Sequence, residues 1–122
     1  MIELTQKQRD LLFKDLSARL SYGVIANIPL TENDNRVYKV TINWLKDFID
    51  NNLVIIPYLR RMSSMTEEEK NTYDMFFNED GLLNTSVDVY IDWLNENHFD
   101  YRGLIPMGLA LPATEGMYNA KN

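Results

Sequence analysis

Cysteine is absent from the 122-residue chain, and histidine occurs only once. Without thiols the chain can form no disulfide, no thiolate nucleophile and no cysteine-containing zinc site, and one histidine is too few for the other common zinc sets. The five glycines are scattered and form neither a dinucleotide fingerprint nor a phosphate loop. No G-x-S-x-G elbow is present. These absences favour a protein that is not an enzyme, and we expect no catalytic residue, no metal and no cofactor.

Long apolar runs are also missing. The longest nearly uncharged run, residues 103–113, contains two prolines and two glycines, whereas a membrane-spanning helix needs about 20 apolar residues. The opening MIELTQKQRD has no basic region followed by an apolar stretch, as a secretory signal would. We therefore expect a soluble, cytoplasmic protein with no membrane partner.

Positive charge is scarce in the second half of the chain. Residues 1–62 carry nine Lys/Arg against seven Asp/Glu, a net charge of +2, and residues 63–122 carry three against eleven, a net charge of −8. Nucleic-acid binders need a basic patch, so we expect no direct contact with nucleic acid. A solvated acidic face that keeps the protein soluble is the simplest interpretation. The alternative is a phosphate mimic that modulates a nucleic-acid process.

The first half of the chain predicts one helix followed by strands. Residues 5–20 have helical apolar spacing, Thr5 and Gln8 stand at capping-box positions, and Gly23 can end the helix in a left-handed conformation. A β-branched run at 24–28, turn formers at 31–35 and period-two alternation over 38–44 then predict an antiparallel hairpin.

The remaining elements complete the predicted fold. Residues 45–49 fit a helical turn or a third strand, and residues 53–56 read as a strand closed by Pro57. Two further helices are predicted, one capped by Thr66 with Glu69 and one capped by Thr85. We therefore predict a single domain over residues 1–122 of class α+β. Its small antiparallel sheet of three or four strands packs with an N-terminal helix and two to three C-terminal helices.

Four polar residues after the last helix are the candidate site. His98 has the side chain whose pKa suits proton transfer near neutrality, and Asp100 follows two positions later. Tyr101 and Arg102 are residue types that often anchor protein interfaces. Each also has a structural interpretation, since His98 can bond the last helix carbonyls, Asp100 can cap a short final helix and Arg102 can pair with the acidic half of the chain. We expect the structural roles to prevail.

The apolar run LIPMGLALP, residues 104–112, follows this corner directly. Burying one such side chain contributes roughly 1.5–3 kcal/mol, so we expect the run to pack back over the sheet and helices. If part of it stays outside the core, it would form a dimer contact. The chain is therefore expected to be a monomer or a weak homodimer.

Two longer motifs carry a resemblance. PYLRRMSSMTEEEK, residues 57–70, and HFDYRGLIPMGLALPATEGMYN, residues 98–119, resemble a group of short bacterial hypothetical proteins. The group occurs in gut anaerobes and their prophages or mobile elements. A proline often follows PYLR in that group, whereas Arg61 stands there in this chain. No activity is attached to the group, so the resemblance implies only a cytoplasmic, mobile-element context.

Three functional hypotheses follow. The leading one is a non-enzymatic, protein-binding accessory domain of a bacterial mobile element, whose partner contacts the Tyr101–Arg102 corner and a sheet face that bears Lys39 and Lys46. The alternative is a small-ligand binder or enzyme, which requires His98, Asp100 and Arg102 to converge on one pocket. The weaker alternative is the acidic modulator of a nucleic-acid process.

Overall fold

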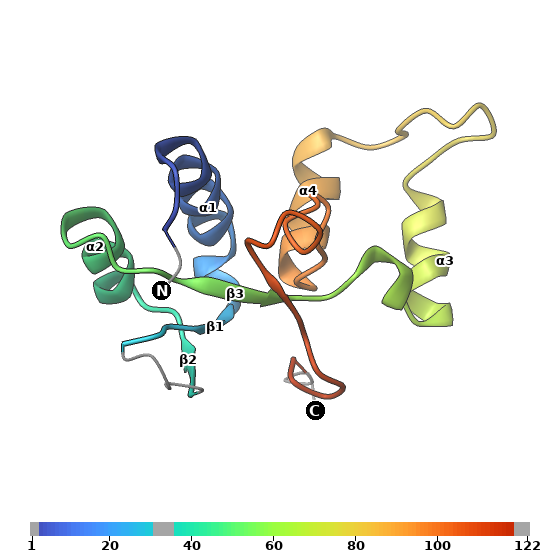
Figure 1. Ribbon diagram of the computed structural model, residues 1–122. Coiled ribbons are helices and arrows are strands. Elements are labelled where there is room, and N and C mark those ends of the chain that lie inside the picture. The colour runs from blue at the N-terminus through green and yellow to red at the C-terminus, as the bar shows by residue number, and fades with distance from the viewer. Residues whose placement is uncertain (1–2, 31–35, 119–122) are drawn as a thin grey trace.

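The computed structural model describes residues 3–30 and 36–118. The predicted α+β class is confirmed: the described residues form four α-helices and a four-stranded sheet in the order β2-β1-β3-β4. Helices α1, α2 and α4 stand on one side of the strands, and α3 lies beyond α4 at the end of the molecule (Figure 1). In chain order the elements are α1 (Gln6–Arg19), η1 (Leu20–Tyr22), β1 (Ile25–Asn27), β2 (Val37–Lys39), α2 (Ile42–Asp50), β3 (Ile56–Leu59), η2 (Met62–Ser64), α3 (Glu67–Met75), α4 (Val87–Glu96) and β4 (Leu111–Pro112).

The first helix begins as its capping box predicts. The Thr5 hydroxyl accepts a hydrogen bond from the Gln8 N–H at 3.1 Å, and the Gln8 side chain accepts one from the Thr5 N–H at 2.9 Å. One turn of 3₁₀-helix, η1, continues α1, and Gly23 then ends it with a φ of 74°, a left-handed conformation that glycine adopts without strain. Both predictions for this helix are confirmed.

The sheet is mixed, because its last strand joins in parallel. β1 pairs antiparallel with β2 and with β3, and β4 pairs parallel with β3. The predicted hairpin of β1 and β2 is therefore confirmed, while its predicted turn at residues 31–35 lies outside the described residues. The predicted antiparallel sheet accounts for β1, β2 and β3, and β4, which comes from the apolar run after the candidate corner, is added in parallel.

The strand predicted over residues 38–44 ends at Lys39. The Thr41 hydroxyl accepts a hydrogen bond from the Trp44 N–H at 3.4 Å and caps α2, which also includes the ambiguous residues 45–49. Alternating apolar residues fit both periods over so short a stretch, and the cap decides for the helix. Lys46 therefore lies on a helix and not on the sheet face beside Lys39.

Two boundaries also differ from prediction. β3 begins at Ile56 and continues through Pro57, which lies opposite Ala26 although it has no N–H to donate. Ser86, not Thr85, caps α4, because its hydroxyl accepts from the Val89 N–H at 3.3 Å. Serine and threonine are both favoured N-cap residues, with serine ranked ahead, and the helix begins one position later than predicted.

The core fills the space between α1, α2 and the strands. The apolar run 104–112 folds back into it: Leu104, Leu109 and Ala110 are buried, while Met107 is 51% exposed. The run thus packs into the core at these three positions, with Ile105 partly buried against it, whereas Pro106, Met107, Gly108, Leu111 and Pro112 stay exposed. The buried core residues are Leu12, Leu16, Val24, Ala26, Ile28, Val40, Leu45, Phe48, Ile55, Leu59, Leu104, Leu109 and Ala110.

Candidate functional site

Asp100 turns the chain after α4. Its two carboxylate oxygens accept hydrogen bonds from the backbone N–H groups of Leu104 at 2.8 Å and Ile105 at 2.9 Å. Its own N–H donates to the Arg60 carbonyl at 2.8 Å. Asp100 therefore caps a turn, not the short helix that the sequence suggested, and both of its oxygens are used.

Arg102 pairs with the first helix instead of with the acidic half of the chain. Its Nε donates to Asp15 at 3.1 Å, and its Nη2 donates to the Tyr101 hydroxyl at 3.0 Å. The Tyr101 hydroxyl in turn donates to the Asn95 side chain at 2.9 Å. The polar atoms of Tyr101 and Arg102 thus hold the corner against α1 and α4, which weakens the case for a partner there.

Asp15 and Arg19 form a buried ion pair beneath this corner. Both side chains are fully buried, and Arg19 Nε lies 3.0 Å from the Asp15 carboxylate. Arg19 Nη2 also donates to the Phe99 carbonyl at 2.6 Å. Because Asp15 lies 87 residues from Arg102, no local pattern in the sequence could indicate this network.

His98 is the member of the corner that these structural roles explain least. The residue is 4% exposed, has a positive φ of 60°, and has no hydrogen-bond partner at Nδ1. Burial and the nearby Arg19 charge lower the pKa of His98 to about 4, against the weaker effect of a hydrogen bond to the Tyr22 backbone. His98 is therefore neutral at physiological pH. Its ring stacks on Tyr118 with a centroid distance of 3.8 Å.

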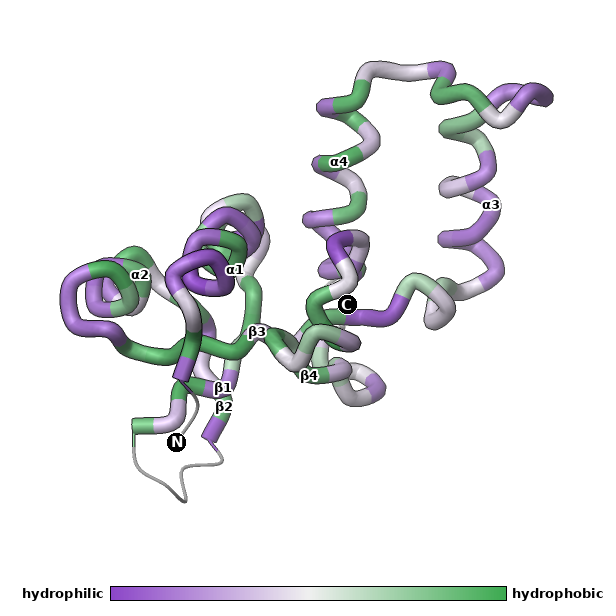
Figure 2. Tube along the Cα trace, turned by 45° about the horizontal axis from the view of Figure 1, so that its top comes forward, coloured by the Kyte–Doolittle hydropathy of each residue, from purple (hydrophilic) through white to green (hydrophobic). Residues whose placement is uncertain are grey.

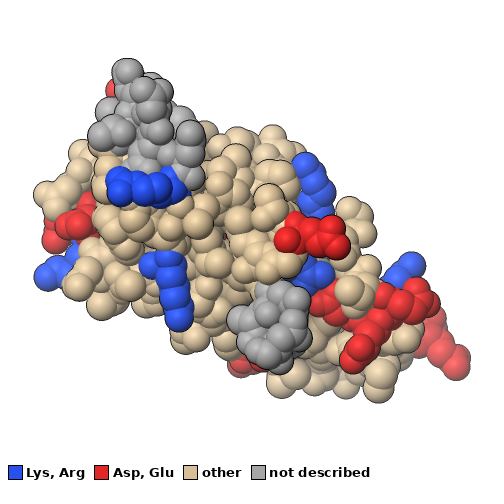
Figure 3. Space-filling model, turned by 90° about the horizontal axis from the view of Figure 1, so that it is seen from below, with Lys and Arg blue, Asp and Glu red and all other residues tan. Residues whose placement is uncertain are grey.

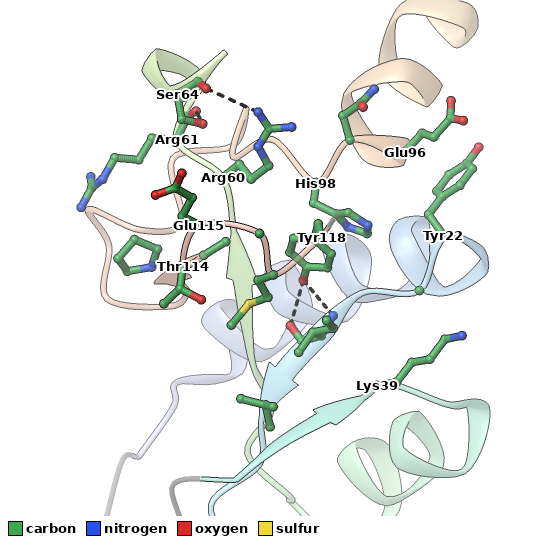
Figure 4. A pocket seen from close by; sticks show the side chains of 18 of the residues that line it. Tyr22, Lys39, Arg60, Arg61, Ser64, Glu96, His98, Thr114, Glu115 and Tyr118 are labelled. Carbon is green, nitrogen blue, oxygen red and sulfur yellow. Dashed lines mark hydrogen bonds between the residues drawn. The ribbon is translucent and has the colours of Figure 1, made fainter. Parts of the chain in front are cut away.

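His98 and Tyr118 line a broad hollow of about 1320 Å³. Figure 4 shows them side by side within it, with Arg61 and Lys39 toward opposite sides of the view. Asp100 lines a smaller hollow of about 270 Å³, and Arg102 lines neither of the two. His98, Asp100 and Arg102 therefore do not converge as the ligand-binding or enzymatic alternative requires.

Helices α3 and α4 contact each other through aromatic side chains at the end of the molecule. They run side by side in Figure 2, and Phe76 packs edge-on against Tyr90 and Trp93 with centroid distances of 5.5 Å. Tyr73 joins the same cluster through contacts with Phe77 and Tyr90. None of the residues of α3 is buried, so the aromatic rings hold a largely exposed helix.

The segment from Glu67 to Glu96, the acidic arm, combines negative charge with exposed apolar surface. It contains nine Asp/Glu and one lysine, Lys70, a net charge of −8. Its acidic side chains gather at the α3 end of the face shown in Figure 3. Four large apolar side chains of the arm are more than half exposed. They are Met75 (76%), Leu82 (63%), Val87 (62%) and Val89 (51%).

Glu69 connects the first turn of α3 to Arg60, the residue that follows β3. Its carboxylate accepts two hydrogen bonds from the Arg60 guanidinium, at 2.6 and 2.7 Å, and one from the Thr66 N–H at 2.9 Å. The hydrogen bonds with Arg60 hold the pKa of Glu69 at about 2. The predicted capping box is confirmed, and Glu69 also makes an ion pair that the sequence did not indicate.

Replacing Glu69 with glutamine is expected to reduce the free energy of unfolding by about 1–2 kcal/mol at pH 7. Glutamine keeps the cap, as Gln8 does in α1, but loses the charged pairing with Arg60. Because pairing lowers the pKa of Glu69 from 4.5 to about 2, the advantage of wild type should shrink as the pH falls through that window. Urea denaturation measures both effects. Glu68→Gln is the control, and an equal loss in that variant would contradict the assignment.

Comparison with known proteins identified no relative of this chain. No protein-family model matches the chain, and no curated protein or solved structure is similar to it. The resemblance to the bacterial mobile-element group therefore stays a prediction. Among the described residues, no group of three His, Asp or Glu side chains could hold a metal ion, and no helix is long and apolar enough to cross a membrane.

Proposed function

We propose that this protein is a protein-binding accessory domain whose acidic arm docks a partner with a basic and partly apolar surface. The observation that carries the proposal is the exposure of four large apolar side chains within a segment of net charge −8. Apolar area and opposite charge together are what a specific protein contact uses, since the first supplies affinity and the second supplies selection. The mobile-element context rests on the sequence resemblance alone.

The charge of the arm favours a different protein over a second copy of this chain. Two copies that met through their arms would bring together two segments of −8, and such repulsion opposes association. Of the nine acidic residues, only Glu69 forms an ion pair within the described part of the chain. The remaining carboxylates are therefore available to pair with a partner's Lys or Arg.

Exposed apolar side chains also occur on α2, which provides an internal comparison. Ile42 and Ile49 are 62% and 58% exposed, which is similar to the exposure of Val87 and Val89 in the arm. The surroundings differ, because α2 carries Lys46 together with Asp47 and Asp50. Apolar exposure together with a large excess of negative charge is found on the arm and not on α2, so we assign docking to the arm.

A cationic amphipathic helical peptide of leucine and lysine is the probe for this proposal, with binding measured by calorimetry. The double variant Val87→Ser/Val89→Ser is expected to weaken binding at least tenfold, which corresponds to about 1.4 kcal/mol and is modest for two contacts of this size. The matched control, Ile42→Ser/Ile49→Ser, should bind as wild type does. Raising the salt concentration should weaken binding in wild type and control alike.

Two outcomes would overturn the proposal. Equal effects of the two double variants would show that the arm has no special role in docking. Oligolysine of the same charge that binds as tightly as the amphipathic probe, and equally to both variants, would show that the arm acts by charge alone. That second result would favour the acidic modulator of a nucleic-acid process.

A further inference from the structure

Tyr118 is held by the sheet in the way that a protein holds a bound ligand. Its hydroxyl accepts a hydrogen bond from the Ile25 N–H at 2.8 Å and lies 2.6 Å from the Tyr58 carbonyl and 3.1 Å from the Ile25 carbonyl. One phenolic proton can serve only one of the two carbonyls, and the shorter distance favours Tyr58. The hydroxyl is thus satisfied as donor and as acceptor by main-chain groups alone.

These main-chain groups are available because the β1–β3 ladder stops one position earlier. The paired residues are Asn27 with Ile56 and Ala26 with Pro57, so Ile25 and Tyr58 stand where the next pair would be. Pro57 has no N–H, and the two strands separate beyond it. The Tyr118 hydroxyl fills this gap and connects the two strands. The gap is therefore a preformed site for one hydroxyl group.

His98 supplies the flat wall of the same site. Its ring lies nearly parallel to the Tyr118 ring, at an angle of 17°. A histidine here is costly, because its Nδ1 is buried without a partner. Asparagine tolerates the positive φ of position 98 as histidine does. What histidine adds is an aromatic face on which a phenol ring can stack.

The segment that carries Tyr118 is otherwise weakly attached. Ala113 donates to the Leu59 carbonyl, and Met117 donates only to Thr114 within the same turn. Among the hydrogen bonds of the described residues, residues 114–118 reach the sheet only through Tyr118. Thr114, Glu115 and Gly116 are exposed. If the Tyr118 side chain leaves, this turn can lift away and open the site to the large hollow beside it (Figure 4).

We propose that Ile25, Tyr58 and His98 form a binding site for a 4-hydroxyphenyl group, which Tyr118 occupies in cis as an internal competitor. An external ligand is a free phenol or the tyrosine of a peptide, and both present the same ring and hydroxyl. A tethered side chain acts at an effective concentration on the order of millimolar. The wild-type chain therefore binds such a ligand weakly. The site becomes available when the turn of residues 114–118 lifts and Tyr118 leaves it.

The test uses the full-length variant Tyr118→Ala with p-cresol as the probe. His98 is the only histidine, so its imidazole NMR signals report on the site without ambiguity. p-Cresol should shift these signals saturably in the variant, and at least tenfold more weakly in wild type. Toluene, which lacks the hydroxyl, should bind the variant at least tenfold more weakly than p-cresol, because it leaves the main-chain groups unpaired.

An acetylated peptide of the sequence ATEGMY, residues 113–118 of this chain, separates the two ligand sources. Tighter binding of this peptide than of p-cresol to Tyr118→Ala supports a peptide tyrosine, and binding of p-cresol alone supports a free phenol. No saturable shift from either probe in a folded variant would overturn the proposal. Equal responses of wild type and variant would do the same, because Tyr118 would then not compete.

Hydrogen exchange on the wild-type chain tests the opening step without any substitution. The Ile25 N–H is protected by Tyr118, whereas the Val40 N–H is bonded within the sheet to the Val24 carbonyl at 2.9 Å. If the tail lifts independently, Ile25 should exchange at least 100-fold faster than Val40. Equal exchange of the two amides would mean that Tyr118 leaves its position only on global unfolding. Tyr118 would then be a core residue, and no external ligand could replace it in the folded chain.

Discussion

Replacing Asp15 with asparagine is expected to destabilise the protein by about 3–5 kcal/mol. The Arg19 side chain is fully buried, with the Asp15 carboxylate as its partner at 3.0 Å. Arg19 Nη1 has no hydrogen-bond partner, so this guanidinium is already incompletely satisfied. Loss of the carboxylate would leave a buried, unpaired charge. Urea denaturation measures the change in the free energy of unfolding.

Two companion variants separate the buried charge from the rest of the network. Arg102→Ala removes the partner that is 18% exposed and should cost only about 1 kcal/mol. The double variant Asp15→Asn/Arg19→Met removes the buried charge as well and should recover part of the loss caused by Asp15→Asn. A loss below 1 kcal/mol in Asp15→Asn would contradict the assignment, because Arg19 would then have another source of compensation.

Acidification from pH 7 to pH 4 is expected to cost about 3 kcal/mol of stability through His98 alone. Burial lowers the pKa of His98 from 6.5 to about 4, so the unfolded chain binds a proton first as the pH falls. The contribution of the neutral histidine is fully present above pH 6.5 and is lost progressively between pH 6.5 and pH 4. About 2 kcal/mol of the loss should appear by pH 5.

His98→Asn is the control for this pH dependence. Asparagine tolerates the positive φ of position 98 and does not titrate. Because Glu69 titrates only below its ordinary value of 4.5, the window from pH 6.5 to 5 isolates the histidine. The unfolding free energy of His98→Asn should be nearly flat across this window. A wild-type curve that is equally flat would show that His98 is accessible to protons in the folded state.

Features that depend on neighbouring residues could be predicted from the sequence. The capping boxes at Thr5 and Thr66 are confirmed because a hydroxyl and an acceptor three residues later define the first turn locally. A local cap at Thr41 likewise explains why the strand predicted over residues 38–44 ends early, at Lys39, and gives way to α2. Alternation suggested a strand, while the cap and the later apolar residues favoured α2.

The candidate site could not be predicted, because its contacts join distant parts of the chain. Arg102 meets Asp15 across 87 residues, and Tyr118 meets Ile25 across 93 and Tyr58 across 60. The charge of the acidic arm was visible in the sequence as the net −8 of the second half. Its exposed apolar side chains were not, since helical spacing puts Val87, which is 62% exposed, on the same face as Leu94, which is buried.

Mapping the bound probe on the protein tests the proposed docking function most directly. In a ¹⁵N-labelled chain titrated with the leucine–lysine peptide, the largest amide shifts should fall within the acidic arm and near Met75, Leu82, Val87 and Val89. The amide signals of α2 around Ile42 and Ile49 should not shift, although these side chains are exposed to a similar degree as those of the arm. Shifts centred on α2, on the strand that bears Lys39 or on the Tyr101–Arg102 corner would contradict the proposed function.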